Sequence, residues 1–105
     1  MKKKSKKHNW AGKILHIFWK HIAKGEPQIA YACPIALALR EQGARDIEVT
    51  TAEITIGNKS FAIPEKASSF VDTFDSDRTV VKPFSFKIGK LLEDEEDEKG
   101  PTLFA

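Results

Sequence analysis

The sequence predicts a small α+β domain, in which a mostly antiparallel sheet of three to five strands carries two main helices. The longest apolar run, 30–43, contains start and stop signals for a helix. Several shorter segments alternate apolar and polar residues with the period of a strand, and a second amphipathic stretch lies among them. Short connections between these segments favour one layer of helices on an antiparallel sheet.

The first apolar segment, 13–24, fits two patterns. As a strand it would be partly covered on both sides, with Leu15, Ile17 and Trp19 on one face and Ile14, His16 and Phe18 on the other. As a helix it would carry an apolar stripe made of Trp10, Ile14, Ile17, Phe18, His21 and Ile22. Periodicity alone leaves both structures open.

The main helix is predicted to begin at Pro34, because the first helical position tolerates a residue without an N–H group. Cys33 then occupies the N-cap, and Gly43 follows the last turn, where a left-handed residue commonly ends a helix. The apolar residues cover more than one face, so we expect this helix to be mostly buried. Its predicted core anchors are Ile35, Leu37 and Leu39.

Three short strands are predicted next, over 46–50, 53–56 and 60–63. Apolar side chains alternate with polar ones in each, which is typical of strands with one buried face. Gly57-Asn58 separates the last two segments and indicates a hairpin turn. The inward residues of the three strands are predicted to be Ile47, Val49, Ile54, Ile56, Phe61 and Ile63.

Pro64 is predicted to open a second helix, which ends at the turn-forming residues 75–77. The helix has an apolar stripe made of Ala67, Phe70, Val71 and Phe74. A last strand is expected over about 80–88, with Phe84, Phe86 and Ile88 on one face. Pro83 cannot donate a ladder hydrogen bond, so the start of this strand is expected at a sheet edge.

The charges are strongly segregated along the chain. Residues 1–24 contain eight lysines and no acid, whereas residues 93–98, EDEEDE, contain six acids and no base. The body between them is nearly neutral. We therefore predict one α+β domain over 13–90, a lysine-rich disordered tail over 1–12 and an acidic tail over 91–105.

Three peptides resemble a known group of proteins: His21-Ile22-x-x-Gly25, Cys33-Pro34-Ile35-Ala36-Leu37-Ala38-Leu39, and Phe70-x-x-x-Phe74-Asp75 leading to Val81-x-Pro83-Phe84-x-Phe86. Together they resemble small uncharacterised proteins often carried by bacteriophages, which open with a short strand and a His-Ile turn. The resemblance covers 15–88 and implies no established activity. It implies a strand through Phe18, followed by a single helical turn over Lys20–Lys24 that ends at Gly25. Ile17-Phe18-Trp19 departs from the pattern, which keeps the helical alternative open.

The residues that could act as nucleophiles, bases or metal ligands form no pattern typical of an enzyme, a metal site or a cofactor site. Cys33, the only cysteine, would be activated by a helix N-terminus, but a buried and inert capping thiol is the favoured interpretation. His16 and His21 lack the spacing of paired metal ligands, and we expect His21 to pack or cap within its turn. One cysteine and no membrane-length apolar run predict a cytoplasmic protein.

We expect a non-enzymatic, phage-associated accessory protein that binds another protein, such as a host or defence component, and that is a monomer or homodimer. The residues least explained by a core, and therefore predicted to bind the partner, are Trp10, Phe18, Trp19 and Lys20. The alternative is a nucleic-acid-binding module, modulated by the acidic tail, which could occupy the basic end. Its binding residues would be Lys2, Lys3, Lys4, Lys6, Lys7, Lys13 and Lys24.

Overall fold

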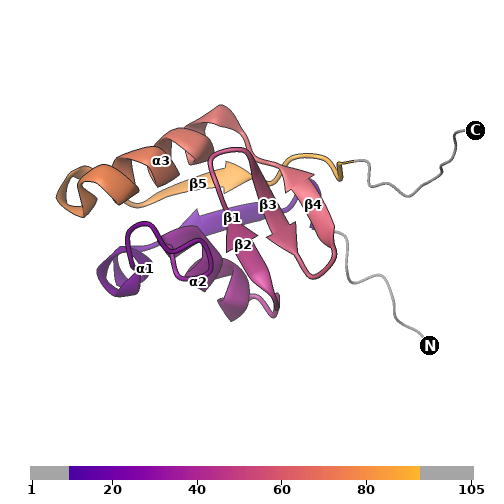
Figure 1. The fold of residues 1–105 in the computed structure, drawn as a ribbon, viewed down its shortest axis with the longest axis horizontal. Helices are drawn as coiled ribbons and strands as arrows, with labels where there is room; N and C mark the ends of the chain where they lie inside the picture. The colour runs from indigo at the N-terminus through magenta and orange to yellow at the C-terminus, as the bar shows by residue number, and fades with distance from the viewer. Residues whose placement is uncertain (1–9, 93–105) are drawn as a thin grey trace, which may run out of the picture.

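Short strands and helices follow one another in nearly the predicted order over residues 10–92, the part of the chain that the computed structural model describes (Figure 1). In chain order they are β1 (Ile14–Ile17), α1 (Trp19–Lys24), α2 (Pro34–Glu41), β2 (Ile47–Val49), β3 (Glu53–Ile56), β4 (Lys59–Ala62), α3 (Glu65–Ser76), the 3₁₀ turn η2 (Arg78–Val80) and β5 (Phe84–Lys87). The predicted α+β class is confirmed. Most of the two predicted tails, 1–9 and 93–105, lies outside the described residues.

The strands form two antiparallel sheets instead of a single regular one. The first and last strands of the fold pair with each other, so that Leu15 lies opposite Phe86. The strands β2, β3 and β4 form a three-stranded meander. Its second hairpin turns at Gly57, whose φ of +64° lies in the left-handed region that glycine adopts without steric cost. The predicted Gly-Asn hairpin is confirmed.

The chain connects the two sheets directly after β5. Gly89 N–H donates to the Ala62 carbonyl at 2.9 Å, and a Cβ at this glycine would lie 2.5 Å from the same oxygen. Beyond it, Ala62 N–H donates to the Lys90 carbonyl at 2.9 Å, and Leu92 N–H donates to the Ser60 carbonyl at 2.8 Å. Residues 89–92 therefore run antiparallel beside β4, and Gly89 permits the close approach that starts this pairing.

The core lies between the sheets and the helices. The α2 helix contacts both β1 and β2, and Ile35, Ala36 and Leu39 have no exposed surface. The apolar stripe of α3 is buried as predicted, and its Phe70 ring stacks on Phe84 of β5 with centroids 4.7 Å apart. The predicted inward residues of β2 and β3 are also buried.

The N-terminal segment is a strand followed by a short helix, which settles the alternative in favour of the strand and turn. The β1 strand pairs with β5, which a continuous helix over 13–24 would prevent. The α1 helix begins at Trp19 and includes Lys20, one residue earlier than expected. Because β1 ends at Ile17, Trp19 does not share the inner face of the strand, and its side chain is exposed.

Three further expectations are wrong in detail. Leu37 is only partly buried, because it lies on the side of α2 that faces Lys20 and His21. The last strand begins at Phe84 and not near Val80, because Val80 belongs to the 3₁₀ turn η2 and residues 81–83 lie between that turn and β5. The helix that follows Pro64 continues to Ser76, through the first two of the three residues expected to end it.

The two leucines of α2 provide a matched test of this burial. We expect Leu39→Ala to lower the free energy of unfolding by about 2–5 kcal/mol, since it leaves a cavity in a closed core. Leu37→Ala deletes the same atoms from the same helix but from a partly exposed site, so its effect should be clearly smaller. Urea denaturation followed by circular dichroism measures both. Equal losses would contradict the described orientation of α2.

Candidate partner-binding surface

One face of β1 is open to solvent. Leu15 and Ile17 are buried, whereas Ile14 is 56% exposed and Phe18, directly after the strand, is 52% exposed. His16 lies between them on the same face, and its ring stacks on Phe18 with centroids 6.1 Å apart. The alternation follows from the two-residue period of a strand. The strand was expected to be partly covered on both sides, whereas one face is buried and the other is largely exposed.

Trp19 extends this exposed face onto α1, where its side chain is 63% exposed. We call Ile14, His16, Phe18 and Trp19 the β1 surface. Exposed apolar residues are ordinary singly, but several adjacent ones are a common feature of interaction sites. Sequence reasoning identified Phe18 and Trp19 and missed Ile14 and His16. The polar His16 on the Phe18 face was the one signal that this face meets water.

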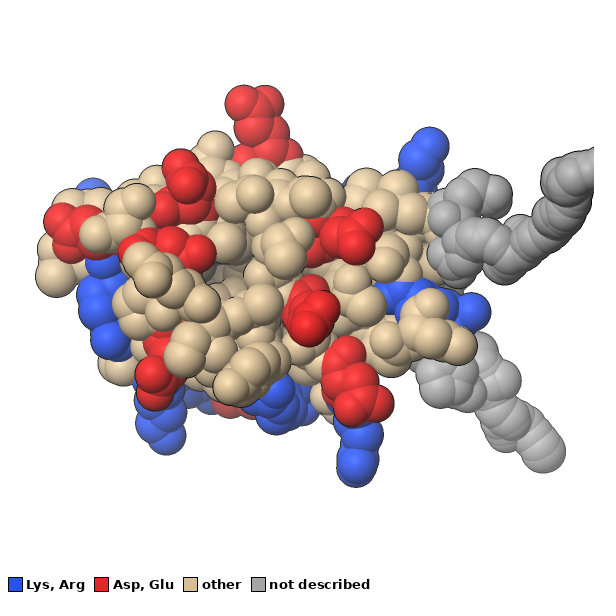
Figure 2. Space-filling view, in the orientation of Figure 1, with Lys and Arg blue, Asp and Glu red and all other residues tan. Residues whose placement is uncertain are grey.

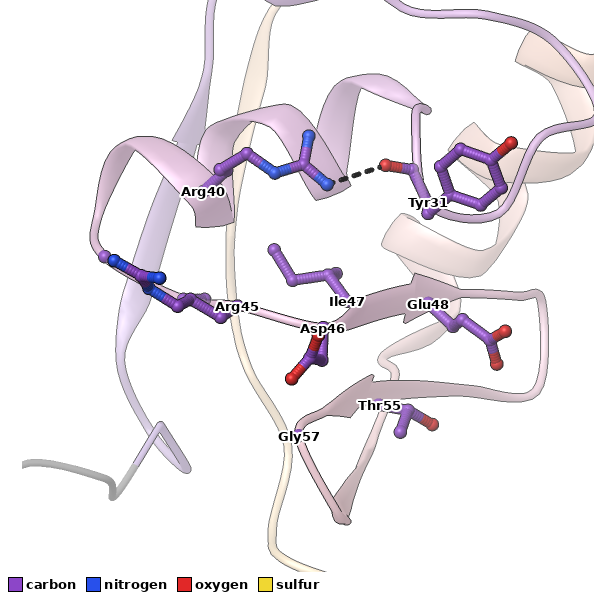
Figure 3. Close-up of a pocket in the computed structure, with 10 residues that line it drawn as sticks. Tyr31, Arg40, Arg45, Asp46, Ile47, Glu48, Thr55 and Gly57 are labelled. Carbon is purple, nitrogen blue, oxygen red and sulfur yellow. Dashed lines mark hydrogen bonds between the residues drawn. The ribbon is translucent and has the colours of Figure 1, made fainter.

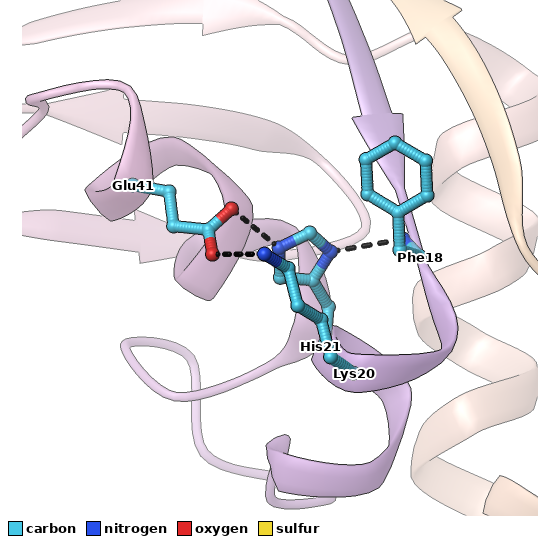
Figure 4. A network of polar contacts seen from close by, with 4 residues as sticks. All are labelled: Phe18, Lys20, His21 and Glu41. Atoms are coloured by element: carbon cyan, nitrogen blue, oxygen red, sulfur yellow. Dashed lines mark hydrogen bonds and ion pairs between the residues drawn. The ribbon is translucent and has the colours of Figure 1, made fainter.

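A buried histidine fixes the backbone next to these aromatic residues (Figure 4). Phe18 N–H donates to Nδ1 of His21 at 2.9 Å, which satisfies a free donor at the start of α1. Since Nδ1 accepts this bond, the neutral ring carries its hydrogen on Nε2, which donates to Glu41 Oε1 at 2.9 Å. The expectation that His21 packs or caps within its turn is confirmed.

Glu41 connects α1 to α2 through two side chains. Besides the bond from His21, its Oε2 lies 2.8 Å from Nζ of Lys20. Hydrogen bonds from Lys20 and then His21 hold the pKa of the Glu41 carboxyl below its usual value. The Lys20 side chain remains largely exposed, and its charge is paired with that of Glu41.

The other end of α1 is held by α3 and the turn that follows it. The guanidinium of Arg78 donates to the carbonyls of Ile22 at 3.0 Å and Ala23 at 2.7 Å, and it lies over the Phe74 ring. Isolated helices much shorter than about 12 residues are not stable in water. The six residues of α1 are therefore held by contacts at both ends. These contacts fix the backbone at Phe18 and Trp19.

Trp10 lies elsewhere. It precedes β1, whereas Phe18 follows it, so the strand separates the two aromatic residues. Trp10 packs partly against the core and lines a hollow of about 560 Å³ near β4, and Nζ of Lys13 lies 5.6 Å from its ring centroid. The structure thus groups Phe18, Trp19 and Lys20 and places Trp10 apart from them.

The residues predicted for nucleic-acid binding do not form one described patch. Lys13 and Lys24 are exposed but lie before β1 and at the end of α1. The other five predicted lysines, Lys2, Lys3, Lys4, Lys6 and Lys7, lie outside the described residues. Figure 2 shows one face, where acidic side chains lie over α3 and the centre and basic ones project along the left and lower margins.

Another hollow, of about 820 Å³, lies between α2 and the strands β2 and β3 (Figure 3). Arg40 on its upper side donates to the Tyr31 carbonyl at 3.0 Å, while Asp46 and Glu48 lie on the opposite side. The lining mixes charges of both signs with backbone at the carboxyl end of α2. It brings together no nucleophile and base, and across residues 10–92 no group of three His, Cys, Asp or Glu side chains is placed to hold a metal ion.

Cys33 is buried at the N-cap of α2, 2% exposed. Burial raises the pKa of its thiol, and this effect outweighs the backbone hydrogen bonds from the helix N-terminus that lower it. At neutral pH the residue is therefore a neutral, enclosed thiol. This matches the inert capping thiol that the sequence favours.

The chain was compared with protein families, curated proteins and solved structures, and none matches it. Among the residues that the structure describes, no helix has the length and apolar character needed to cross a membrane.

Thiol reactivity gives a direct check on Cys33. We expect a disulfide reagent such as DTNB to modify the native protein slowly at neutral pH, because the thiol is both buried and protonated. In denaturant the same cysteine should react at the rate of a free thiol. Rapid stoichiometric reaction of the native protein would contradict the enclosed site.

The Glu41 contacts predict a pH-dependent stability. Folding lowers the Glu41 pKa, so the ionised carboxylate stabilises the folded protein. This stabilisation is fully present above the pKa of Glu41 in the unfolded chain, and it is lost as the pH falls through the lower pKa of the folded protein. Thermal unfolding of wild type and Glu41→Gln should therefore differ most near neutral pH and converge in acid. Glu48→Gln, which removes one exposed charge from β2, is the control. A difference that stays constant with pH would contradict this coupling.

Proposed function

We propose that this protein is a non-enzymatic binding protein, which contacts another protein through the β1 surface. The observation that supports it is the exposure of Phe18 and Trp19 on a backbone fixed at both ends of α1. Large aromatic side chains supply much of the energy of protein interfaces. A fixed backbone reduces the entropy lost on association, because fewer groups need ordering.

The charges around the β1 surface favour an acidic partner. Lys87 lies opposite Ile14 in the register of β1 and β5, and Lys24 ends α1. Over 10–24 there is no acidic residue, and Glu41 is already paired with Lys20 and His21. In this proposal the partner has an apolar pocket for the two aromatic rings, surrounded by carboxylates.

The buried Cys33 thiol supports a non-enzymatic role, since the most nucleophilic side chain type in the chain is enclosed. One cysteine is consistent with a cytoplasmic protein, which we include in the proposal. The resemblance to phage-carried proteins makes a host or defence component the first kind of partner to test.

The test is a comparative pull-down from lysate of the cells that carry this gene, followed by titration of each captured protein. We expect Phe18→Ala with Trp19→Ala to weaken binding of the specific partner by about 30-fold or more, as for loss of about 2 kcal/mol at an interface anchor. Thermal unfolding should change little, because both side chains are largely exposed and the Phe18 N–H is retained.

Tyr31→Ala is the matched control, since Tyr31 is an equally exposed aromatic residue that lies outside the β1 surface, beside the hollow between α2 and β2. Binding that resists the double substitution, or that is weakened as much by Tyr31→Ala, would contradict the assignment of the surface. A protein that instead binds duplex or single-stranded DNA, with an affinity that falls steeply with salt, would support the alternative function.

A further inference from the structure

The hollow beside Trp10 lies at the end of the molecule where the described chain both begins and ends. The indigo first segment and the yellow last segment lie together near β4 in Figure 1. Trp10, Ile56 and Phe61 contribute apolar surface to this hollow, and Arg45 and Lys59 contribute positive charge. It is a different surface from the one proposed to bind a partner protein.

The last described residues pair with β4, which brings the chain to the edge of this hollow. Leu91 lies opposite Phe61, and Leu92 N–H donates to the Ser60 carbonyl at 2.8 Å. If the same antiparallel pairing continued by one residue beyond Leu92, the partner of Lys59 would be Glu93. Partners opposite each other in a ladder share a face, and Lys59 and Phe61 both line the hollow. Continued pairing would therefore bring the first acid of the run 93–98 to a lysine.

The charges at this end complement the acidic run. Lys59 and Arg45 line the hollow, and Lys13 lies over the ring of Trp10. Asp46, which also lines the hollow, opposes them with a single negative charge. An extended run of six residues spans at most about 20 Å, enough to follow the hollow from β4 toward Arg45.

We propose that the hollow beside Trp10 is a binding site for an acidic peptide, and that its occupant is the chain's own segment 93–98. Glu93 pairs with Lys59, and the following carboxylates lie along Arg45 and the edge of Trp10. When the segment occupies this site, Trp10 is covered and is not one of the partner-binding residues. The carboxylates also neutralise the basic charge at this end of the molecule.

Trp10 fluorescence in the full chain tests the proposal, with Trp19→Phe used to leave a single tryptophan. Replacing all six acids of 93–98 by their amides should increase quenching of Trp10 by acrylamide, a neutral reagent. In the chain with its acids, 1 M NaCl should have the same effect, because the screening length falls to about 3 Å. Unchanged quenching in both experiments would overturn the proposal.

Charge reversal tests the residues and the register. Lys59→Glu with Arg45→Glu should expose Trp10, whereas Lys66→Glu with Lys82→Glu, which does not touch the hollow, should leave it protected. Protection lost through Lys59→Glu alone should return when Glu93→Lys is added. Glu98→Lys should not restore it, because residue 98 is not opposite Lys59.

Two other occupants give distinct results, and each would overturn the proposal. If the acidic run binds the N-terminal lysines, replacing Lys2, Lys3, Lys4, Lys6 and Lys7 with Gln would expose Trp10, while reversal of Lys59 and Arg45 would not. If the run comes from a second copy, protection would fall on dilution in step with a dimer detected by light scattering. Protection that is independent of concentration and lost with Lys59 and Arg45 supports the intramolecular site.

Discussion

The burial of α2 against both sheets is the constraint on which the rest of the structure depends. Ile35, Ala36 and Leu39 are fully enclosed, and the helix contacts β1 from one sheet and β2 from the other. With α2 fixed, Val49 of β2 donates to the Ala30 carbonyl, and Glu41 at the end of α2 is positioned to hold α1.

The α1 helix depends entirely on its neighbours, and this has a consequence for binding. Its start is held by the bond from Phe18 N–H to His21, its middle by Glu41 and its end by Arg78. These contacts use backbone groups and the side chains of His21, Glu41 and Arg78, so none requires the Phe18 or Trp19 ring. The fold therefore fixes these two residues and leaves their side chains free for another molecule, which is the physical basis of the proposed binding.

The two proposed binding sites occupy separate parts of the molecule. The β1 surface lies at the end of β1 and the start of α1, whereas the hollow lies at the start of β1 beside β4. In these proposals an acidic partner uses the first, and the chain's own acidic run uses the second. The strong charge segregation along the sequence then has a structural use, since the run neutralises one basic end and leaves Lys24 and Lys87 for the partner.

The sequence by itself determined the α+β class, the positions of α2, α3 and the hairpin, and most of the core, because strand and helix periods and the Pro and Gly signals are local. It also singled out Phe18, Trp19 and Lys20. Only the tertiary structure decided that Leu37 is partly exposed, that Trp10 lies apart from Phe18, and that residues 89–92 join the sheets. Those features depend on which elements meet in space, and contacts between distant segments leave no periodic signal along the chain.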